Sequence, residues 1–72
     1  MITGEIIRLV RIWKKLKQKT VANKLGISQP AYSKLEKCKH INQQRLDKLL
    51  NILNCSERDL EIFRRLIPHS EK

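Results

Sequence analysis

The chain has 72 residues, and its 16 lysine and arginine residues against 7 aspartate and glutamate residues give a formal net charge of +9. A chain this short forms one domain with a thin core and has little room for a deep substrate pocket. It contains no glycine-rich phosphate loop and no usable set of His, Ser and carboxylate side chains, so we expect no catalysis. It also lacks an apolar run near the roughly 20 residues of a membrane span, and no signal peptide follows Met1. We therefore expect a cytoplasmic protein.

The positive charge lies mainly in the first half of the chain. Residues 1–40 contain 10 basic and 2 acidic residues, a balance of +8, whereas residues 41–72 contain 6 basic and 5 acidic residues, a balance of +1. A polyanion would therefore be bound by the first half, which leaves the second half for another role.

Two cysteines, Cys38 and Cys55, are expected to be reduced thiols inside a cell. Together with His40 and His69 they lack the paired C-x-x-C spacing of a zinc site. We therefore expect neither a metal ion nor a cofactor.

Helical periodicity extends along the chain and no alternating strand pattern occurs, which predicts an all-α protein of five helices. The first two helices are predicted over 4–16 and 18–25. Gly26 then stands where a helix end favours a left-handed residue. The third helix is predicted over 28–37, with Ser28 as its N-cap.

The fourth helix is predicted over 42–53 and is followed by Asn54, which tolerates the left-handed conformation that ends a helix. Ser56 and Asp59 have the spacing of a capping box, which predicts a fifth helix over 56–67.

The second and third helices, from Gln18 to Lys37, have the pattern of a helix-turn-helix, whose second helix enters the major groove of DNA. This unit needs a small residue where its helices cross, which Ala22 supplies, and a turn residue with positive φ, which Gly26 supplies. The residues expected to lock the two helices together are Val21, Leu25, Ile27, Tyr32 and Leu35. Ala31 is also expected to be buried.

With Ile7, Arg8 and Arg11 before it, the run from Gln18 through Ala22 and Gly26 to Ser28-Gln29 resembles the phage Cro and repressor type of helix-turn-helix, also called the xenobiotic-response-element family. The resemblance implies a five-helix bundle like that of lambda repressor. It implies that Gln18 holds a DNA phosphate, that Gln29 reads a base edge, and that Arg8 forms a salt bridge with Glu36.

Geometry also selects DNA-contacting residues, because the first turn of the third helix and the positions one turn later point into the groove. The base-reading candidates are Ser28, Gln29, Pro30, Ser33 and Lys34. Gln29 can bind adenine in bidentate fashion, which contributes about 1–3 kcal/mol of discrimination. The phosphate-binding candidates are Lys17, Gln18, Lys19, Lys37, Lys39 and Asn42. Phosphate contacts set the register on the duplex without reading its sequence.

A helix-turn-helix monomer contacts only a few base pairs, so we expect a homodimer on a two-fold-symmetric operator. The expected interface on the fifth helix consists of Leu60, Phe63, Leu66 and Ile67. Two alternatives remain open: the last helix folds back on the first, or an apolar patch with Leu9, Ile12 and Trp13 forms the interface.

The sequence therefore predicts a regulator of transcription, and most simply a repressor, that binds double-stranded DNA on the nucleoid. A different class of function is a protein-interaction module or antitoxin-type partner that keeps the fold and binds DNA only with a second protein. The polar residues Gln29, Ser33 and Lys34 favour DNA reading. A cationic membrane-surface peptide is disfavoured, because the basic residues are spread over several capped helices.

Overall fold

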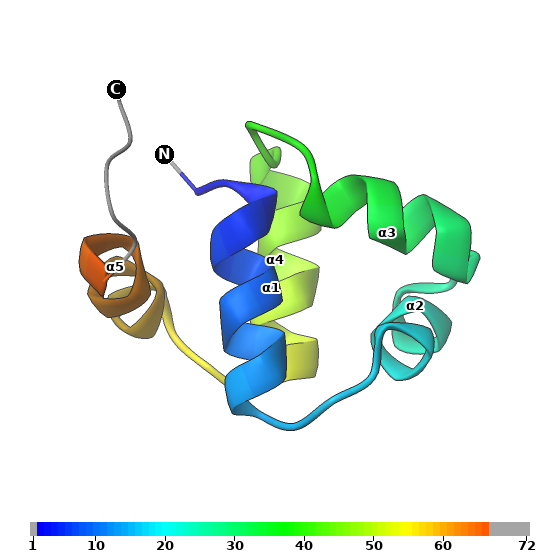
Figure 1. Cartoon of the computed structure of the whole chain (residues 1–72), viewed down its shortest axis with the longest axis horizontal. Coiled ribbons are helices and arrows are strands. Elements are labelled where there is room, and N and C mark those ends of the chain that lie inside the picture. Colours follow the sequence, from blue (N-terminus) through cyan, green and yellow to red (C-terminus); the bar gives the residue numbers. More distant parts are fainter. Residues whose placement is uncertain (1, 67–72) are drawn as a thin grey trace.

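The computed structural model describes residues 2–66 and contains five α-helices (Figure 1). They are α1 (Gly4–Trp13), α2 (Gln18–Leu25), α3 (Gln29–Glu36), α4 (Gln43–Leu53) and α5 (Glu57–Leu66). No strand occurs between residues 2 and 66, so the predicted all-α class is confirmed. None of the helices is long and apolar enough to cross a membrane.

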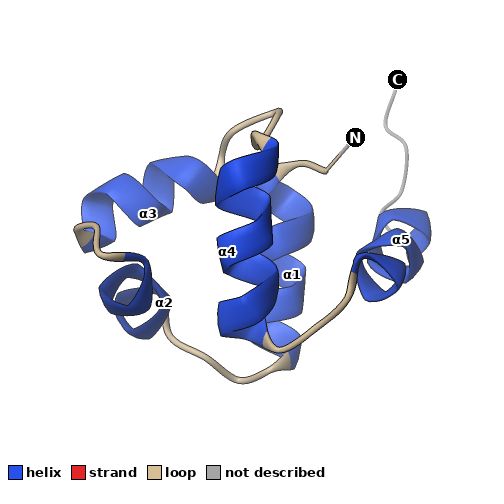
Figure 2. Ribbon diagram, turned by 180° about the vertical axis from the view of Figure 1, so that it is seen from behind, coloured by secondary structure: helices blue, strands red, loops and turns tan. Residues whose placement is uncertain are grey.

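The two central helices, α1 and α4, lie side by side, with α2 and α3 on one side of them and α5 on the other (Figures 1 and 2). The core between them is apolar. Its completely buried members come from all five helices and include Ile7, Val10, Val21, Tyr32, Leu49 and Leu60. This arrangement leaves the outer surface of α3 free.

The predicted helix boundaries follow from local capping. The Ser28 hydroxyl accepts a hydrogen bond from the backbone N–H of Ala31 at 3.2 Å, as an N-cap does. Gly26 and Asn54 take the left-handed conformation after α2 and α4, with φ of 77° and 55°. Before α5, the backbone N–H of Ser56 donates to the Asp59 carboxylate at 3.0 Å, and the Asp59 N–H donates back to the Ser56 hydroxyl at 3.4 Å. The capping box is therefore confirmed.

The first helix ends earlier than predicted, at Trp13 instead of residue 16. The chain leaves the helix through Lys15, which has a φ of 60° although it is not glycine. The backbone N–H of Leu16 returns to the carbonyl of Arg11 at 3.0 Å and closes this turn. No glycine or proline in the sequence marks this helix end. The prediction rested on periodicity alone and therefore placed the end about one turn too late. The predicted end of the fifth helix, Ile67, lies outside the described residues.

The N-terminus of α1 packs directly on the end of α3. A Cβ atom added to Gly4 would overlap the carbonyl oxygen of Leu35 and lie 2.5 Å from the carbonyl carbon of Glu36. The Gly4 N–H donates a hydrogen bond to the carbonyl of Cys38 at 2.9 Å. A second backbone hydrogen bond between the same two segments runs from the Ile41 N–H to the Ile2 carbonyl at 3.2 Å. Glycine is needed here because the two backbones are so close.

Candidate nucleic-acid interface

The helix-turn-helix is a tightly packed unit. Ala22 is buried, and its carbonyl accepts a hydrogen bond from the Ile27 N–H at 3.0 Å across the turn at Gly26. The five residues expected to lock the pair are all buried or packed against the core. Ala31 is not, because α3 turns Tyr32 and Glu36, one helical turn apart, toward the core and leaves Ala31 exposed. The prediction that Ala31 is buried was wrong.

The outer surface of α3 carries most of the predicted base-reading residues. Gln29, Pro30 and Lys34 are exposed there, and Ser33 is half-buried. Ser28 is exposed as well, but its hydroxyl oxygen already caps the helix. The side chains of Gln29 and Lys34 form no hydrogen bond with another described residue, so both are available to a ligand.

The predicted phosphate-binding residues surround this surface. Lys17 and Lys19 are exposed at the start of α2, and Lys37 and Lys39 are exposed at and after the end of α3. Asn42 is exposed before α4, and its side-chain oxygen accepts from the Arg45 N–H at 2.8 Å, so its amide N–H groups remain available. Gln18 differs from the others because it is half-buried and its side chain is bonded inside the protein.

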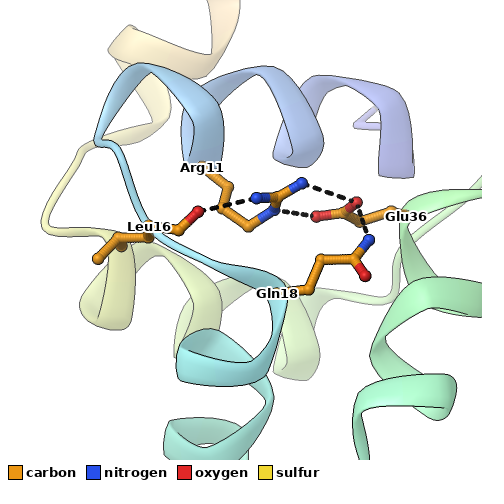
Figure 3. A network of polar contacts seen from close by, with 4 residues as sticks. All are labelled: Arg11, Leu16, Gln18 and Glu36. Carbon is orange, nitrogen blue, oxygen red and sulfur yellow. Dashed lines mark hydrogen bonds and ion pairs between the residues drawn. The ribbon is translucent and has the colours of Figure 1, made fainter.

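Gln18 belongs to a buried polar network that joins α1, α2 and α3 (Figure 3). Its amide nitrogen donates to Glu36 Oε1 at 2.8 Å. Glu36 Oε2 pairs with Arg11 Nε at 2.5 Å, and Arg11 Nη1 donates to the carbonyl of Leu16 at 2.8 Å. The side chain of Glu36 is only 3% exposed, and Glu36 is the only buried charged residue among those that the structure describes.

The salt bridge implied for Arg8 is therefore formed by Arg11 instead. Arg8 lies one turn earlier on α1 and is exposed. The two arginines are three residues apart, so they lie near each other on the helix surface, and only the rotation of α1 against α3 decides which one reaches Glu36. With Lys37 and Lys39, Arg8 lines an open hollow beside the end of α3.

The pKa of the Glu36 carboxyl lies below its ordinary value. Burial acts in the opposite direction, because it disfavours the charged form, but the hydrogen bonds from Arg11 and Gln18 outweigh it. Burial likewise raises the pKa of Tyr32, the neighbouring buried phenol. Glu36 is therefore an ionised, fully paired carboxylate directly behind the predicted DNA-binding surface.

A second surface lies on the far side of α1 from α2 and α3, where α1 meets α5 (Figures 1 and 2). The large exposed apolar residues of these two helices are Ile12 (47% exposed), Trp13 (56%), Ile62 (52%) and Leu66 (69%). Half-buried Phe63 joins the two helices, because its ring centroid lies 5.4 Å from that of Trp13. We call these five residues the α1–α5 patch.

The structure corrects part of the predicted dimer interface. Leu60 is completely buried within the monomer, so it belongs to the core. The last helix folds back on the first, as one alternative required, yet it leaves Leu66 on the surface. Ile67 lies outside the described residues, and Ile62 was not predicted, although it precedes Leu66 by one turn. The Trp13–Phe63 contact joins the two helices on which the sequence predicted apolar patches.

No group of three or more His, Cys, Asp or Glu side chains in residues 2–66 is placed to hold a metal ion. Cys38 is exposed and Cys55 is half-buried, and both are free thiols.

Comparison with known proteins points to one family. A family model described as "Helix-turn-helix" matches residues 7–60. No curated protein matches the sequence. The fold is similar to that of a mutant of the restriction-modification controller protein C.Esp1396I, whose crystal structure superposes with a TM-score of 0.75. The two chains are 20% identical, over 94% of this chain and 91% of the other.

Proposed function

Because the chain belongs to the helix-turn-helix family of DNA-binding transcriptional regulators, we propose that it is a homodimeric repressor that reads a two-fold-symmetric operator with α3. The observation that carries the proposal is the outer surface of α3, where Gln29 and Lys34 are exposed beside a buried, rigidly packed inner face. A helix held in this way can enter the major groove without rearranging.

Gln29 is the main base-reading residue in this proposal. It is the first residue of α3, and its amide presents a donor and an acceptor that match N7 and N6 of adenine. Lys34, one turn further along, reaches guanine or a phosphate, and the ring of Pro30 contacts a thymine methyl group. Ser28 and Ser33 contribute hydroxyl contacts at the edges of this surface.

The DNA backbone is held by residues on either side of α3. Lys17, Gln18 and Lys19 lie at the N-terminus of α2, whose positive end favours an anion. Lys37, Lys39 and Asn42 lie between α3 and α4. Together they supply the electrostatic, sequence-independent part of the affinity.

Two copies of the chain pair through the α1–α5 patch. Large exposed apolar side chains are typical of protein interfaces, and α5 lies on the opposite side of α1 from α3. In this proposal the symmetric pair presents two α3 helices to half-sites about one helical turn apart, or about 10 base pairs. DNA binding also places the protein on the nucleoid in the cytoplasm.

Selection from a random duplex library at about 150 mM salt tests this function. The wild type should enrich a two-fold-symmetric motif, and Gln29→Ala should relax one adenine position in each half-site. Gln44→Ala is the matched control, because Gln44 is an exposed glutamine on α4, and it should enrich the wild-type motif. If no motif is enriched, sequence-specific reading is refuted.

The same patch supports one other candidate, a protein-interaction module whose partner is a different protein. This candidate predicts a monomer in sedimentation at all accessible concentrations and no sequence-specific DNA binding unless the second protein is present. A concentration-dependent dimer that selects a palindromic motif would exclude it.

A further inference from the structure

The side chain of Gln18 has a fixed orientation before any DNA is bound. Glu36 is ionised and can only accept hydrogen bonds, so the Gln18 group that faces it must be the NH₂ and not the carbonyl. Figure 3 shows the amide nitrogen turned toward the carboxylate and the carbonyl oxygen turned away. One N–H of the NH₂ group is used in this 2.8 Å contact, and the second remains available.

A carboxylate behind a phosphate-binding residue would ordinarily weaken the binding of DNA, because it repels the phosphate. Here Arg11 neutralises it through the Nε–Oε2 contact of 2.5 Å. The guanidinium and the carboxylate are nearly buried, at 12% and 3% exposure of their side chains. The charge of the carboxylate is therefore balanced inside the network, whose third side chain, Gln18, is a half-buried neutral amide.

We propose that Glu36 is a positioning residue for binding of the DNA backbone. Glu36 holds the Gln18 amide so that the second N–H of that amide meets a phosphate. This inference rests on the phosphate contact of Gln18 in the proposed function. Glu36 itself does not touch the DNA. It removes the rotational freedom that a glutamine side chain would otherwise lose on binding, so the contact is preorganised.

The start of α2 supports this role. Its N-cap, Lys17, makes no side-chain capping bond, so the first backbone N–H groups of α2 are left to a ligand or to water. The Gln18–Glu36 bond joins this helix end to the end of α3. Glu36 thus fixes one phosphate-binding helix end relative to the base-reading helix.

A double-mutant cycle on the selected operator tests the proposal, with Glu36→Gln, Gln18→Ala and the two combined. Gln18→Ala should weaken binding about tenfold, the loss expected for one hydrogen bond to a charged group. In the wild-type background, Glu36→Gln should weaken binding about fivefold, because it loosens the Gln18 contact with the phosphate. In the Gln18→Ala background this contact is already lost, so Glu36→Gln should weaken binding less than about twofold. Equal weakening by Glu36→Gln in both backgrounds would overturn the inference.

Glu5→Gln is the matched control for charge. Glu5 is exposed and lines the same hollow as Glu36, so this variant also removes one negative charge near the end of α3. It should bind DNA as tightly as the wild type or more tightly. If Gln18→Ala itself leaves the affinity unchanged, the phosphate contact in the proposed function fails, which is a result distinct from failure of the positioning role.

A second measurement needs no substitution at Glu36 and so does not depend on the stability of that variant. In ¹⁵N relaxation of the free wild-type protein, the order parameter of the Gln18 side-chain NH₂ should approach that of rigid backbone, about 0.85. The exposed Gln44 should fall below about 0.6. A Gln18 amide as mobile as that of Gln44 would contradict the preorganised contact.

Discussion

Arg11 and Glu36 are 25 residues apart in the sequence and form a nearly buried ion pair, in which Arg11 Nε lies 2.5 Å from Glu36 Oε2. The pair joins the end of α1 to the end of α3. Because Arg11 also donates to the carbonyl of Leu16, it holds the connection into α2 as well. One guanidinium group therefore contacts both the end of α3 and the connection into α2.

Replacement of Arg11 by leucine should lower the free energy of unfolding by about 3–5 kcal/mol, because it leaves the Glu36 carboxylate buried and unpaired. Thermal unfolding followed by circular dichroism measures this loss. Arg8→Leu removes the same charge from an exposed position one turn earlier and should change stability by less than about 0.5 kcal/mol. Similar losses in the two variants would mean that the pair does not hold the fold.

The stability should depend on pH through Glu36. Its pKa is lower in the folded protein than in the unfolded chain, so its contribution is complete above the unfolded pKa and is lost as the pH falls through the folded one. Denaturation followed as a function of pH should show stability falling below about pH 4.3, the ordinary value for glutamate. Glu36→Gln should flatten this fall, with Glu5→Gln as the control. An unchanged pH profile in Glu36→Gln would contradict the assignment.

Gly4→Ala should be strongly destabilising, because the added methyl group would overlap the backbone at the end of α3. Overpacking of this kind costs about 1–3 kcal/mol, and each kcal/mol lowers the Tm of a domain this small by about 4–8 °C. Gly26→Asn is the comparison, because nothing lies within 4 Å of a Cβ at Gly26 and asparagine tolerates its positive φ. The close packing of α1 on α3 would be refuted if Gly4→Ala melted at the wild-type temperature.

Leu66→Glu should give a folded monomer, because Leu66 is the most exposed residue of the α1–α5 patch. Sedimentation velocity over a range of concentrations, together with helicity from circular dichroism, separates assembly from folding. Leu60→Ala should instead lower stability by about 2–5 kcal/mol, as expected for truncation of a buried leucine. A Leu66→Glu variant that still dimerises would place the interface elsewhere.

Phosphate contacts should be visible in the salt dependence of DNA affinity. Lys19→Gln should reduce the slope of log K against log salt by about 0.9, the value for one lost contact with duplex DNA. Lys48→Gln is the matched control, because Lys48 is exposed on α4 and lines a different hollow, beside Lys24. Its slope should equal that of the wild type. Equal reductions would indicate general charge attraction instead of a specific contact at Lys19.

The local features of the fold could be predicted from the sequence, because each depends on the preferences of one or two residues. Gly26 and Asn54 take the left-handed conformation, Ser28 caps α3, and Ser56 opens the capping box of α5. The match of the family model confirms the resemblance to the Cro and repressor type of helix-turn-helix. Local chemistry and a short motif were thus sufficient to identify the unit.

The features that were missed depend on how the helices rotate and pack against one another. Arg8 and Arg11 lie three residues apart on α1, so helical periodicity places them near the same face. Only the packing of α1 on α3 decides that Arg11, and not Arg8, pairs with Glu36. The same holds for Ala31, which is exposed, and for Leu60, which α1 covers. The need for glycine at position 4 also arises from packing, because its φ is not positive and only the nearby α3 backbone excludes a side chain.

Two backbone hydrogen bonds join residues 2–4 to residues 38–41, and this seam has a consequence for the order of folding. Contacts within the helix-turn-helix are local in sequence and can form early, whereas the seam must close a long loop, which is slow because of its entropic cost. We therefore expect the DNA-reading surface to reach its final geometry only when α1 docks. An isolated α2–α3 peptide, or a graft of it onto another scaffold, would carry the recognition residues without the framework that aims them.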